Sequence, residues 1–384
     1  VRRLIGVIRV LQVIEATEGG ARRHLRDLAA TLDPAEFHLE MAVSCMRDPD
    51  FRRDLAGYAA RGITVREIPM QRGIAPFRDL MSLFRLVACV RAARPDVVHA
   101  HSSKAGALAR LAGRLCGAPV VYTPHGLSFL MRCGRISRRL YRLVESVLAG
   151  WTRLLIAVSA EECQAALSIG YAPGRVRLIR NGVAPCDAGE VMIRESGVLQ
   201  VGFFGRLSPQ KSPDTLLDAA ADVAAHIPQT VFNFYGDGEL APKLSEKIRC
   251  AGLSSHVRLA GAYAQGEAVT MMRQMDVVAV PSLWEGCPYV VLEAFQAGVP
   301  VVAARAGGIC DLIEDGVNGI LTDPGSAESL CDGLLRLLRD AGLRESLARQ
   351  ARASLDRHTL SEMVGALEAV YRDAASPGTS PGEN

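Results

Sequence analysis

The sequence predicts an α/β protein built from two doubly wound domains in series. Short β-branched runs alternate with helical patterns throughout the chain, which is typical of parallel β-α-β units with helices on both faces of a sheet. The alternation pauses at Asn181–Gly197, where Gly, Pro, Asp, Glu and Ser cluster, and then restarts. Such a pause indicates a linker, and a length of 384 residues favours two or three domains.

The first domain is expected to alternate strands and helices. The strands are β-branched runs near 8–14, 37–44, 63–68, 96–101, 119–124, 153–158 and 176–179. The helices have apolar residues at helical spacing and cover Ala21–Leu32, Phe51–Arg61, Phe77–Ala93, Lys104–Cys116, Ile136–Ala149 and Glu161–Ile169.

The second domain repeats the pattern. Its strands are Leu199–Phe204, Thr230–Tyr235, Val257–Ala260, Val277–Val280, Val299–Ala303 and Gly319–Leu321, with helices at Pro213–Ala225 and Tyr289–Ala297. We expect an N-terminal domain at 1–182, a linker at 183–198, a C-terminal domain at 199–358, a C-terminal helix at 359–375 that can pack back on the first domain, and a disordered polar tail at 376–384. Ligands of doubly wound sheets bind outside the carboxyl ends of strands, so the default site is the cleft between the domains.

The composition is that of a soluble globular protein, with 49% apolar and 22% charged residues. No apolar run in the sequence approaches the roughly 18 residues of a membrane-spanning helix. Ile8–Ile14 is a strand-like run without the cleavage site of a signal peptide, so we expect no leader. Ten cysteines lie singly, without a CxxC pair, which favours a reduced cytoplasm over a zinc site or disulfides.

Charge is distributed unevenly along the chain. Residues 1–182 carry a formal charge of +13 and residues 183–384 one of −10, within a total of +3. Halves of opposite charge indicate two domains with different partners. Only four of the 44 basic residues are lysines, so a single lysine either marks a place that needs a compact ammonium group or stands there by chance.

The first strand leads into Glu18-Gly19-Gly20, followed by a predicted helix. Glycines at this point allow backbone N–H groups to approach a phosphate at the helix N-terminus, although a simple tight turn also explains them. The spacing is not GxGxxG, so the fingerprint of an NAD-binding protein is absent from the sequence.

His125 follows the strand Val120–Thr123 in the segment Thr-Pro-His-Gly, which places an imidazole at the carboxyl end of a strand. A hydrogen-bonded structural role is the alternative for it. His99 and His101 end the preceding strand and point the same way. They have the spacing of metal ligands, but no third ligand is evident in the sequence, so we expect packing and polar contacts there.

Two segments of the second half carry charged residues at strand ends. Arg206 and Lys211 lie between strand Leu199–Phe204 and the following helix, where two cations and a helix N-terminus can flank a diphosphate. Glu285 follows strand Val277–Val280, and Glu293 lies eight residues later in an apolar helix. A buried carboxylate is costly unless something such as a ribose diol pairs with it. A solvated loop and structural salt bridges are the alternatives.

Taken together, these residues make the chain resemble the retaining glycosyltransferases of glycosyltransferase family 4. The resemblance runs from about Arg9 to about Tyr371 and rests on the Glu285 and Glu293 pair, Arg206 with Lys211, and His125-Gly126. It also includes four further segments, namely His-Ala-His-Ser-Ser-Lys-Ala-Gly at 99–106, Asn-Gly-Val at 181–183, Gly-Asp-Gly at 236–238 and Ala-Gly-Gly at 306–308.

The resemblance implies a GT-B fold, with two Rossmann-like domains facing a central cleft and the nucleotide-sugar donor on the second. The implied ligands are Arg206 and Lys211 for the diphosphate, Glu293 for the ribose hydroxyls, Glu285 for the transferred sugar, Gly19 and Gly20 for the phosphate side of the cleft, and His125 for the sugar near its reacting carbon. We therefore take His125 and Glu285 as candidate catalytic residues and the others as substrate-binding. The resemblance implies no cofactor and no metal, because cations and helix dipoles neutralise the leaving diphosphate. It also implies no protein nucleophile, because retention in this family is ascribed to attack on the same face, assisted by the leaving phosphate.

The sequence departs from the family pattern at two places. Ala184 follows Asn181-Gly182-Val183 where the family often has Asp, and Cys310-Asp311 lie where it often has Glu. Other interpretations stay open: a sugar-nucleotide-binding protein or an epimerase of the same two-domain fold, and a metal-dependent transferase marked by Asp48-Pro49-Asp50. A nucleic-acid partner is not expected, since no motif accompanies the basic half.

A basic segment follows His125-Gly126. Arg132, Arg135, Arg139 and Arg142 share one face if the segment is helical, Ile136, Leu140, Leu143 and Val147 line another, and Phe129, Leu130 and Met131 come just before. Such a segment is typical of a helix that lies on anionic lipid. The alternative is an apolar face packed on the first sheet. We expect a UDP-sugar donor before GDP-mannose, a lipid-linked saccharide acceptor in polysaccharide assembly, and a cytoplasmic protein that meets the inner face of the cell membrane.

Overall fold

The computed structural model describes residues 6–186 and 197–376 and divides into two compact units. Unit 1 comprises Val1–Arg180 and Ser361–Asn384, and unit 2 comprises Asn181–Leu360. Most of the expected linker, at 187–196, and the expected tail from residue 377 lie outside the described residues.

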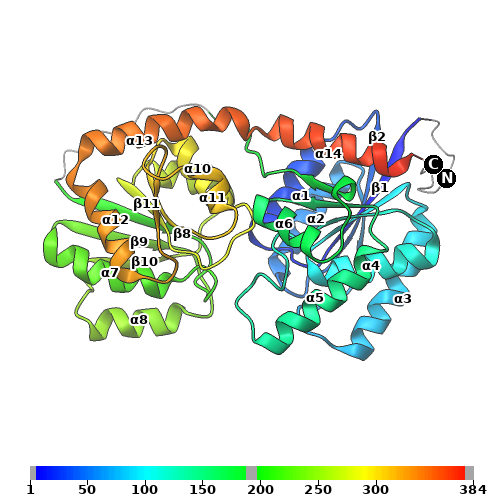
Figure 1. Ribbon diagram of the computed structural model, residues 1–384, viewed down its shortest axis with the longest axis horizontal. Coiled ribbons are helices and arrows are strands. Elements are labelled where there is room, and N and C mark those ends of the chain that lie inside the picture. Colours follow the sequence, from blue (N-terminus) through cyan, green and yellow to red (C-terminus); the bar gives the residue numbers. More distant parts are fainter. Residues whose placement is uncertain (1–5, 187–196, 377–384) are drawn as a thin grey trace. The chain divides into compact units, whose positions relative to one another are not determined.

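Unit 1 is built on a seven-stranded parallel sheet in the order β3-β2-β1-β4-β5-β6-β7 (Figure 1). Its strands are β1 (Ile8–Ile14), β2 (Phe37–Val43), β3 (Thr64–Glu67), β4 (Val97–His101), β5 (Val120–Thr123), β6 (Leu154–Ala157) and β7 (Val176–Leu178). Its helices are α1 (Gly19–Thr31), α2 (Arg52–Ala60), α3 (Pro76–Ala93), α4 (Ser103–Cys116), α5 (Arg135–Ala149), α6 (Ala160–Ser168) and α14 (Leu360–Ala375). The strands lie where the sequence predicted them, because central parallel strands are continuous β-branched runs.

Helix α14 belongs to unit 1 although it follows unit 2 in the chain. Its Arg372 makes two hydrogen bonds to Glu36, just before β2, and its Tyr371 is fully buried and bonded to Gln12 of β1. The last helix is therefore fixed by side chains from the first two strands.

Unit 2 is built on a six-stranded parallel sheet in the order β10-β9-β8-β11-β12-β13. Its strands are β8 (Leu199–Phe204), β9 (Thr230–Tyr235), β10 (Val257–Gly261), β11 (Val277–Val280), β12 (Val301–Ala304) and β13 (Ile320–Thr322). Its helices are α7 (Pro213–His226), α8 (Ala241–Cys250), α9 (Ala268–Met272), α10 (Tyr289–Ala297), α11 (Ile309–Leu312), α12 (Ala327–Arg339) and α13 (Ala341–Ser354). Strand β12 starts two residues later than expected from the sequence, since Pro300 has no N–H for the ladder.

Both units have the α/β architecture with a doubly wound sheet, as the sequence predicted. In each, the strand order reverses at one point: between β1 and β4 in unit 1, and between β8 and β11 in unit 2. Ligands of such sheets bind at the carboxyl ends of the strands that flank this switch point. These two edges are therefore where a site is expected.

Candidate active site

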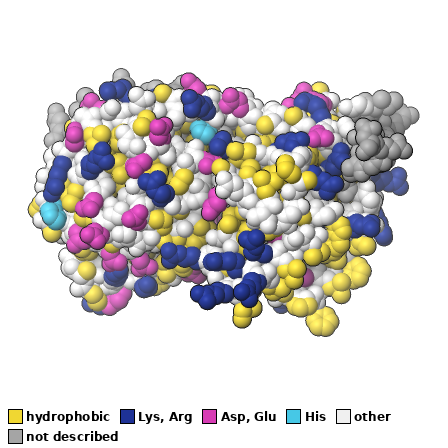
Figure 2. All heavy atoms as spheres, viewed as in Figure 1, with side chains coloured by type: hydrophobic (Ala, Val, Ile, Leu, Met, Phe, Trp, Pro, Cys, Tyr) yellow, Lys and Arg dark blue, Asp and Glu magenta, His cyan; other side chains and the backbone are white. Residues whose placement is uncertain are grey.

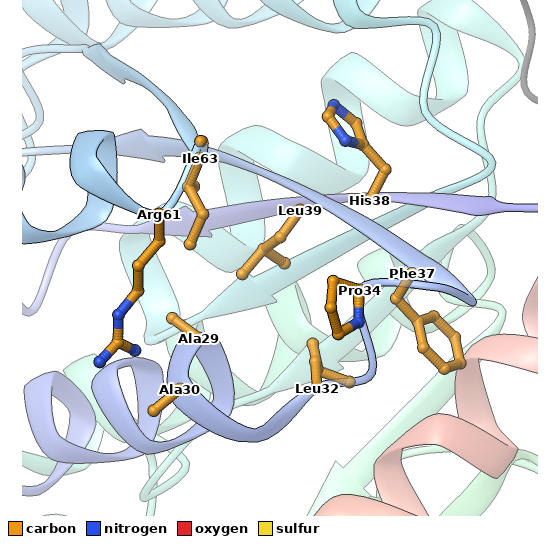
Figure 3. A pocket seen from close by; sticks show the side chains of 10 residues that line it. Ala29, Ala30, Leu32, Pro34, Phe37, His38, Leu39, Arg61 and Ile63 are labelled. Carbon is orange, nitrogen blue, oxygen red and sulfur yellow. The ribbon is translucent and has the colours of Figure 1, made fainter.

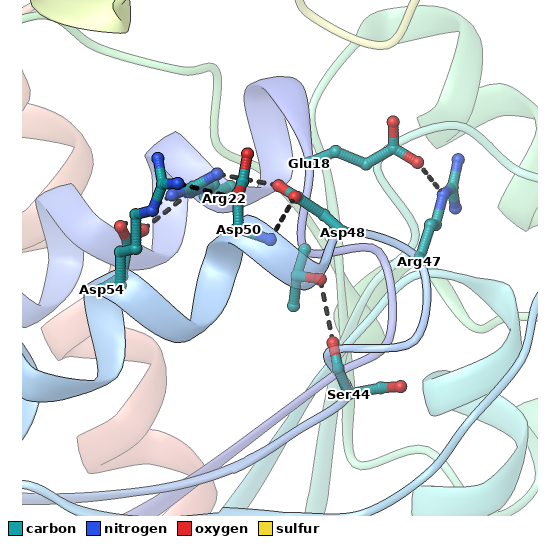
Figure 4. A network of polar contacts seen from close by, with 9 residues as sticks. Glu18, Arg22, Ser44, Arg47, Asp48, Asp50 and Asp54 are labelled. Carbon is teal, nitrogen blue, oxygen red and sulfur yellow. Dashed lines mark hydrogen bonds and ion pairs between the residues drawn. The ribbon is translucent and has the colours of Figure 1, made fainter.

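The β1–α1 loop brings Gly19 and Gly20 to the switch point of unit 1. Gly19 has a φ of +59° and starts α1, a conformation that favours glycine. The N-cap residue Glu18 pairs with Arg47, and the Thr17 hydroxyl donates to the Ser44 carbonyl at 2.9 Å (Figure 4). The loop is thus held from the β2 side, and the first N–H groups of α1 carry the partial positive charge of a helix N-terminus.

Asp48 and Asp50, the alternative metal pair, are part of the same network. Asp48 accepts a hydrogen bond from Arg22 at 2.8 Å with one oxygen and from the Asp50 N–H at 3.0 Å with the other (Figure 4). Arg22 also makes two bonds of 2.7 Å to Asp54. Both oxygens of Asp48 therefore brace the loop, which explains this Asp-x-Asp pattern as structural.

His125 lies after β5 in a left-handed backbone conformation, with φ +53°, followed by Gly126 at φ +117°. Glu162 at the start of α6 holds this turn: its carboxylate accepts hydrogen bonds from the Gly126 N–H and, at 2.9 Å, from the Val158 N–H. Burial raises the pKa of Glu162 to about 7. The sequence analysis missed Glu162, and its position in the first turn of a predicted helix gave no signal for this contact.

A third histidine joins the cluster. The ring centroid of His24, on α1, lies 5.0 Å from that of His125 and 5.5 Å from that of His101, and nitrogen atoms of the three rings lie within 4.8 Å of one another. The sequence analysis did not place His24 with these rings, and the group found among the described residues is His24, His101 and His125, without His99. The missed signal was that His24 comes one helical turn after Gly20, so it returns to the same edge of the sheet.

The histidines of β4 make polar contacts, as expected. The His99 ring contacts the Tyr371 hydroxyl at 2.7 Å and the Thr123 hydroxyl at 2.8 Å. The His101 ring contacts Gln12 Oε1 at 2.7 Å and His125 Nε2 at 3.0 Å. Burial holds the pKa values of His99, His101 and His125 well below the usual range, so the three rings are neutral near pH 7. Within the described residues, His24, His101 and His125 are the group whose chemistry fits a metal ion.

In unit 2 the structure joins two candidate residues directly. Lys211 Nζ donates to Glu285 Oε1 at 2.5 Å, and their side chains are 22% and 7% exposed. Their loops follow β8 and β11, the two strands at the switch point. Backbone contacts tie the loops together, because the Leu283 N–H donates to the Gln210 carbonyl at 2.8 Å and the Gln210 side chain to the Trp284 carbonyl at 3.1 Å.

The other family-like segments support these loops. A Cβ at Gly236 would lie 1.9 Å from the Gly205 carbonyl oxygen, and one at Gly238 would lie 2.4 Å from that of Leu207, so only glycine fits the close approach of the two backbones. Asn181 donates to the Cys287 carbonyl at 2.6 Å, and the Gly308 N–H to the Glu285 carbonyl at 3.2 Å. Three segments far apart in the sequence thus support the two loops: Gly236–Gly238 lies against the loop after β8, and Asn181 and Gly308 hold the loop that carries Glu285.

Arg206 and Glu293 occupy the same region of unit 2. Arg206 is half-buried in the loop after β8. Glu293 is 6% exposed in α10, all of whose residues are buried. The burial of this carboxylate was predicted from its apolar neighbours, and the ligands assigned to these residues stay predictions.

The basic segment after Gly126 differs from the expectation in two respects. Helix α5 begins at Arg135, so Arg132 precedes it. Phe129 is buried in the core of unit 1, with the Arg142 guanidinium 5.3 Å from the centre of its ring. Glu145 of α5 also forms a buried ion pair with Arg110 of α4, at 2.8 Å.

The apolar face of α5 is exposed, which contradicts the alternative of a face packed on the sheet. The exposed residues are Ile136, at 85%, with Leu140, Leu143, Val144 and Val147. The arginines of α5 at 135, 138, 139 and 142 are exposed too. Helix α3 adds Phe77, Leu80, Met81 and Phe84 as exposed apolar residues. Figure 2 shows dark blue and yellow side chains gathered over α5, and further yellow ones over α3.

A separate surface pocket of about 280 Å³ lies between the end of α1, the start of β2 and the residues before β3 (Figure 3). Ala29, Leu39 and Ile63 are among its lining residues. It lies at the amino-terminal edge of the sheet, opposite the edge that carries His125. Because doubly wound sheets bind ligands at the carboxyl edge, we do not assign the chemistry to this pocket.

The chain has two doubly wound units, each built on a sheet of parallel strands and each with candidate residues at its switch point. This architecture defines a protein of the GT-B class. Residues 19–182 match the family described as "Glycosyl transferase 4-like domain", and residues 194–354 match "Glycosyl transferases group 1". The chain therefore belongs to the glycosyltransferases of the family 4 type with a GT-B fold.

Individual relatives agree with this assignment. The chain is 31% identical to an Escherichia coli UDP-Gal:α-D-GlcNAc-diphosphoundecaprenol α-1,3-galactosyltransferase, over 70% of this chain and 73% of the relative. It is 28% identical to a D-inositol 3-phosphate glycosyltransferase of Saccharomonospora viridis, over 82% and 80%. The solved structure of Anabaena HepE in complex with UDP and glucose has a TM-score of 0.81 at 24% identity, covering 95% of this chain and 100% of that one. Among the described residues, the helices are too short or too polar to cross a membrane.

Proposed function

We propose that this glycosyltransferase moves a sugar from a UDP-sugar to a lipid-linked saccharide, with retention at the anomeric carbon and without a divalent metal. The observation that carries the proposal is the Lys211–Glu285 pair at the switch point of unit 2, braced by the family-like segments. A nucleoside diphosphate bound there would meet Lys211, Arg206 and the N-terminus of α7. GDP-mannose is the second choice of donor.

The same residues explain how the reaction can proceed without a metal. The bond that breaks joins the anomeric carbon to the diphosphate, so negative charge develops on the leaving group. Lys211 and Arg206, with the N–H groups at the start of α7 just after Ser212, supply positive charge at that point. The acceptor hydroxyl attacks on the face that the diphosphate leaves, and its proton passes to the leaving phosphate. No protein nucleophile takes part.

His125 and Glu285 are proposed as the residues that contact the transferred sugar. The bond from Lys211 holds Glu285 beside the cation that we propose for the diphosphate. His125 is held by Glu162 through Gly126 and by His101. Gly19 and Gly20 would present the first N–H groups of α1 to a phosphate, and Glu293 would accept hydrogen bonds from the ribose hydroxyls.

A lipid-linked acceptor is supported by two observations. The Escherichia coli relative is named for a diphosphoundecaprenol acceptor, and α5 exposes apolar residues beside four arginines. Such a helix suits the surface of an anionic membrane. We therefore propose peripheral association with the inner face of the cell membrane through α5, to which the exposed apolar residues of α3 add a further contribution.

The direct test is transfer from labelled UDP-galactose, UDP-glucose and GDP-mannose to a synthetic N-acetylglucosamine diphospho-lipid. Free N-acetylglucosamine serves as the control acceptor. We expect a disaccharide-lipid whose new linkage is α by NMR, formed equally with EDTA. An inverted linkage, or activity that EDTA abolishes and Mn²⁺ restores, contradicts the mechanism. Equal transfer to the free sugar contradicts the lipid-linked acceptor, and an epimerised donor without transfer indicates the alternative function.

A further inference from the structure

A buried chain of hydrogen bonds links the C-terminal helix to His125. Gln12 Nε2 donates to the Tyr371 hydroxyl at 2.9 Å, and Gln12 Oε1 lies 2.7 Å from His101 Nε2. His101 Nδ1 in turn lies 3.0 Å from His125 Nε2. Gln12, His101 and Tyr371 are completely buried, so each of these polar atoms depends on its partner in the chain.

The position of each proton follows from the first bond. Because the Gln12 amide nitrogen donates to Tyr371, the amide oxygen faces His101 and can only accept. His101 therefore carries its proton on Nε2 and has an unprotonated Nδ1. The hydrogen bond at Nδ1 then requires a donor, which is the Nε2–H of His125.

A side branch satisfies the remaining proton of Tyr371. Its oxygen accepts from Gln12, so its own O–H donates to His99 Nδ1 at 2.7 Å. His99 consequently donates from Nε2 to the Thr123 hydroxyl at 2.8 Å.

We propose that Tyr371 and Gln12 are positioning residues that act through His101 to keep His125 in the tautomer protonated on Nε2. His125 Nδ1 is then its one acceptor atom, so the ring receives a hydrogen bond from a sugar hydroxyl instead of donating one. This proposal rests on the proposed function for its catalytic consequence. It also gives α14 a role in the site, since Tyr371 comes from that helix.

The tautomer is measured first, in the ligand-free protein, by two-bond proton–nitrogen correlations of the histidine rings. We expect His125 with Nε2 protonated in the wild type and a mixture of tautomers in Tyr371→Phe. Tyr171→Phe is the matched control, because Tyr171 is also buried in unit 1 and its hydroxyl bonds to Arg110 and Thr152, outside the chain. His125 protonated on Nδ1 in the wild type overturns the proposal, whatever the protein's activity.

Kinetics then separate positioning from structure. In Tyr371→Phe we expect kcat to fall about 3- to 10-fold, as for the loss of one neutral hydrogen bond, with an unchanged KM for the donor. The double variant Tyr371→Phe/Gln12→Glu should recover the turnover, because a carboxylate can only accept from His101 and restores the direction of the chain. Unchanged kcat in a folded Tyr371→Phe protein, or equal losses in Tyr171→Phe, overturns the proposal.

The metal content of the purified protein gives an independent check. A metal ion bound between the rings of His24, His101 and His125 would take the place of the proton shared by His101 and His125. We expect elemental analysis to find substoichiometric zinc and other transition metals. One equivalent of zinc, lost in His24→Ala, overturns the hydrogen-bonded chain and replaces it with a metal centre.

Discussion

Replacing Lys211 with alanine should weaken the binding of a nucleoside diphosphate while the protein stays folded. The Lys211 ammonium has three N–H donors, and one of them is used by Glu285 at 2.5 Å. Two donors remain for phosphate oxygens. A hydrogen bond between charged groups contributes roughly 1.5–3 kcal/mol, so the dissociation constant for UDP should rise roughly 10- to 150-fold.

Lys211→Ala should lower the free energy of unfolding only slightly. The Lys211 side chain is 22% exposed, and Glu285 keeps backbone contacts to Gly308. A partly exposed ion pair contributes about 1 kcal/mol or less. Lys243→Ala is a matched control, because Lys243 is another of the four lysines, lies in unit 2 and pairs with Asp214 at 3.5 Å on the surface.

The assay is isothermal titration with UDP, accompanied by thermal unfolding of each variant. Glu285→Gln adds a second comparison: it removes a negative charge from the phosphate region, so UDP should bind at least as tightly while sugar transfer falls. The assignment of Lys211 is refuted if the folded Lys211→Ala protein binds UDP within about twofold of the wild type, a difference of about 0.4 kcal/mol.

Three further predictions concern other parts of unit 1. Arg110→Met should lower the free energy of unfolding by about 3–5 kcal/mol, because it leaves the buried Glu145 without its cation. Chemical denaturation measures this against the exposed Arg114→Met, and equal losses in the two variants would contradict it. The pKa of Glu162 is raised to about 7 in the folded state, so its contribution to stability is present below about pH 4.5 and is lost as the pH rises towards 7. Denaturation midpoints between pH 5 and pH 8 should therefore fall less steeply in Glu162→Gln, and an unchanged slope argues against the shift. Replacing Arg135, Arg138, Arg139 and Arg142 with serine should weaken binding to anionic vesicles in co-sedimentation, with a loss of about 1 kcal/mol of binding free energy for each arginine. Salt should weaken the vesicle binding of the wild type in the same way. The control variant has serine at the exposed Arg336, Arg339, Arg349 and Arg352. If the wild type bound neutral vesicles as well as anionic ones, the membrane proposal would be wrong.

The strands and the edge that carries the candidate residues could be predicted because both follow from local patterns. Central parallel strands are β-branched runs, and a residue just after such a run lies at the carboxyl edge. His125 and Lys211 were located in this way. The pattern of one segment does not show what covers it, which is why Phe129 was expected at the start of a membrane-surface segment and is buried in the core of unit 1. The buried pair of Arg110 with Glu145 could not be predicted for the same reason.

Contacts between side chains that lie far apart in the sequence could not be predicted. Lys211 and Glu285 are 74 residues apart, and His99 and Tyr371 are 272 apart. Each residue alone is compatible with an ordinary surface or core position. In unit 2 the sheet order, with β8 next to β11, brings the loops of Lys211 and Glu285 together. Tyr371 reaches His99 because α14 belongs to unit 1 and buries Tyr371 there. Neither arrangement follows from the local pattern of one segment.

The buried chain of hydrogen bonds from Tyr371 to His125 shows how such contacts can couple one residue to another that it does not touch. With Gln12 Nε2 towards the Tyr371 hydroxyl and Gln12 Oε1 towards His101, the shared protons of this chain have one consistent arrangement. Any other arrangement with this amide orientation leaves a buried donor facing a donor or an acceptor facing an acceptor, which costs about 1–3 kcal/mol for each unsatisfied group. The direction set at Gln12 is therefore passed on completely to His125. A residue on the last helix can in this way determine whether a ring at the candidate active site donates or accepts, without touching the substrate.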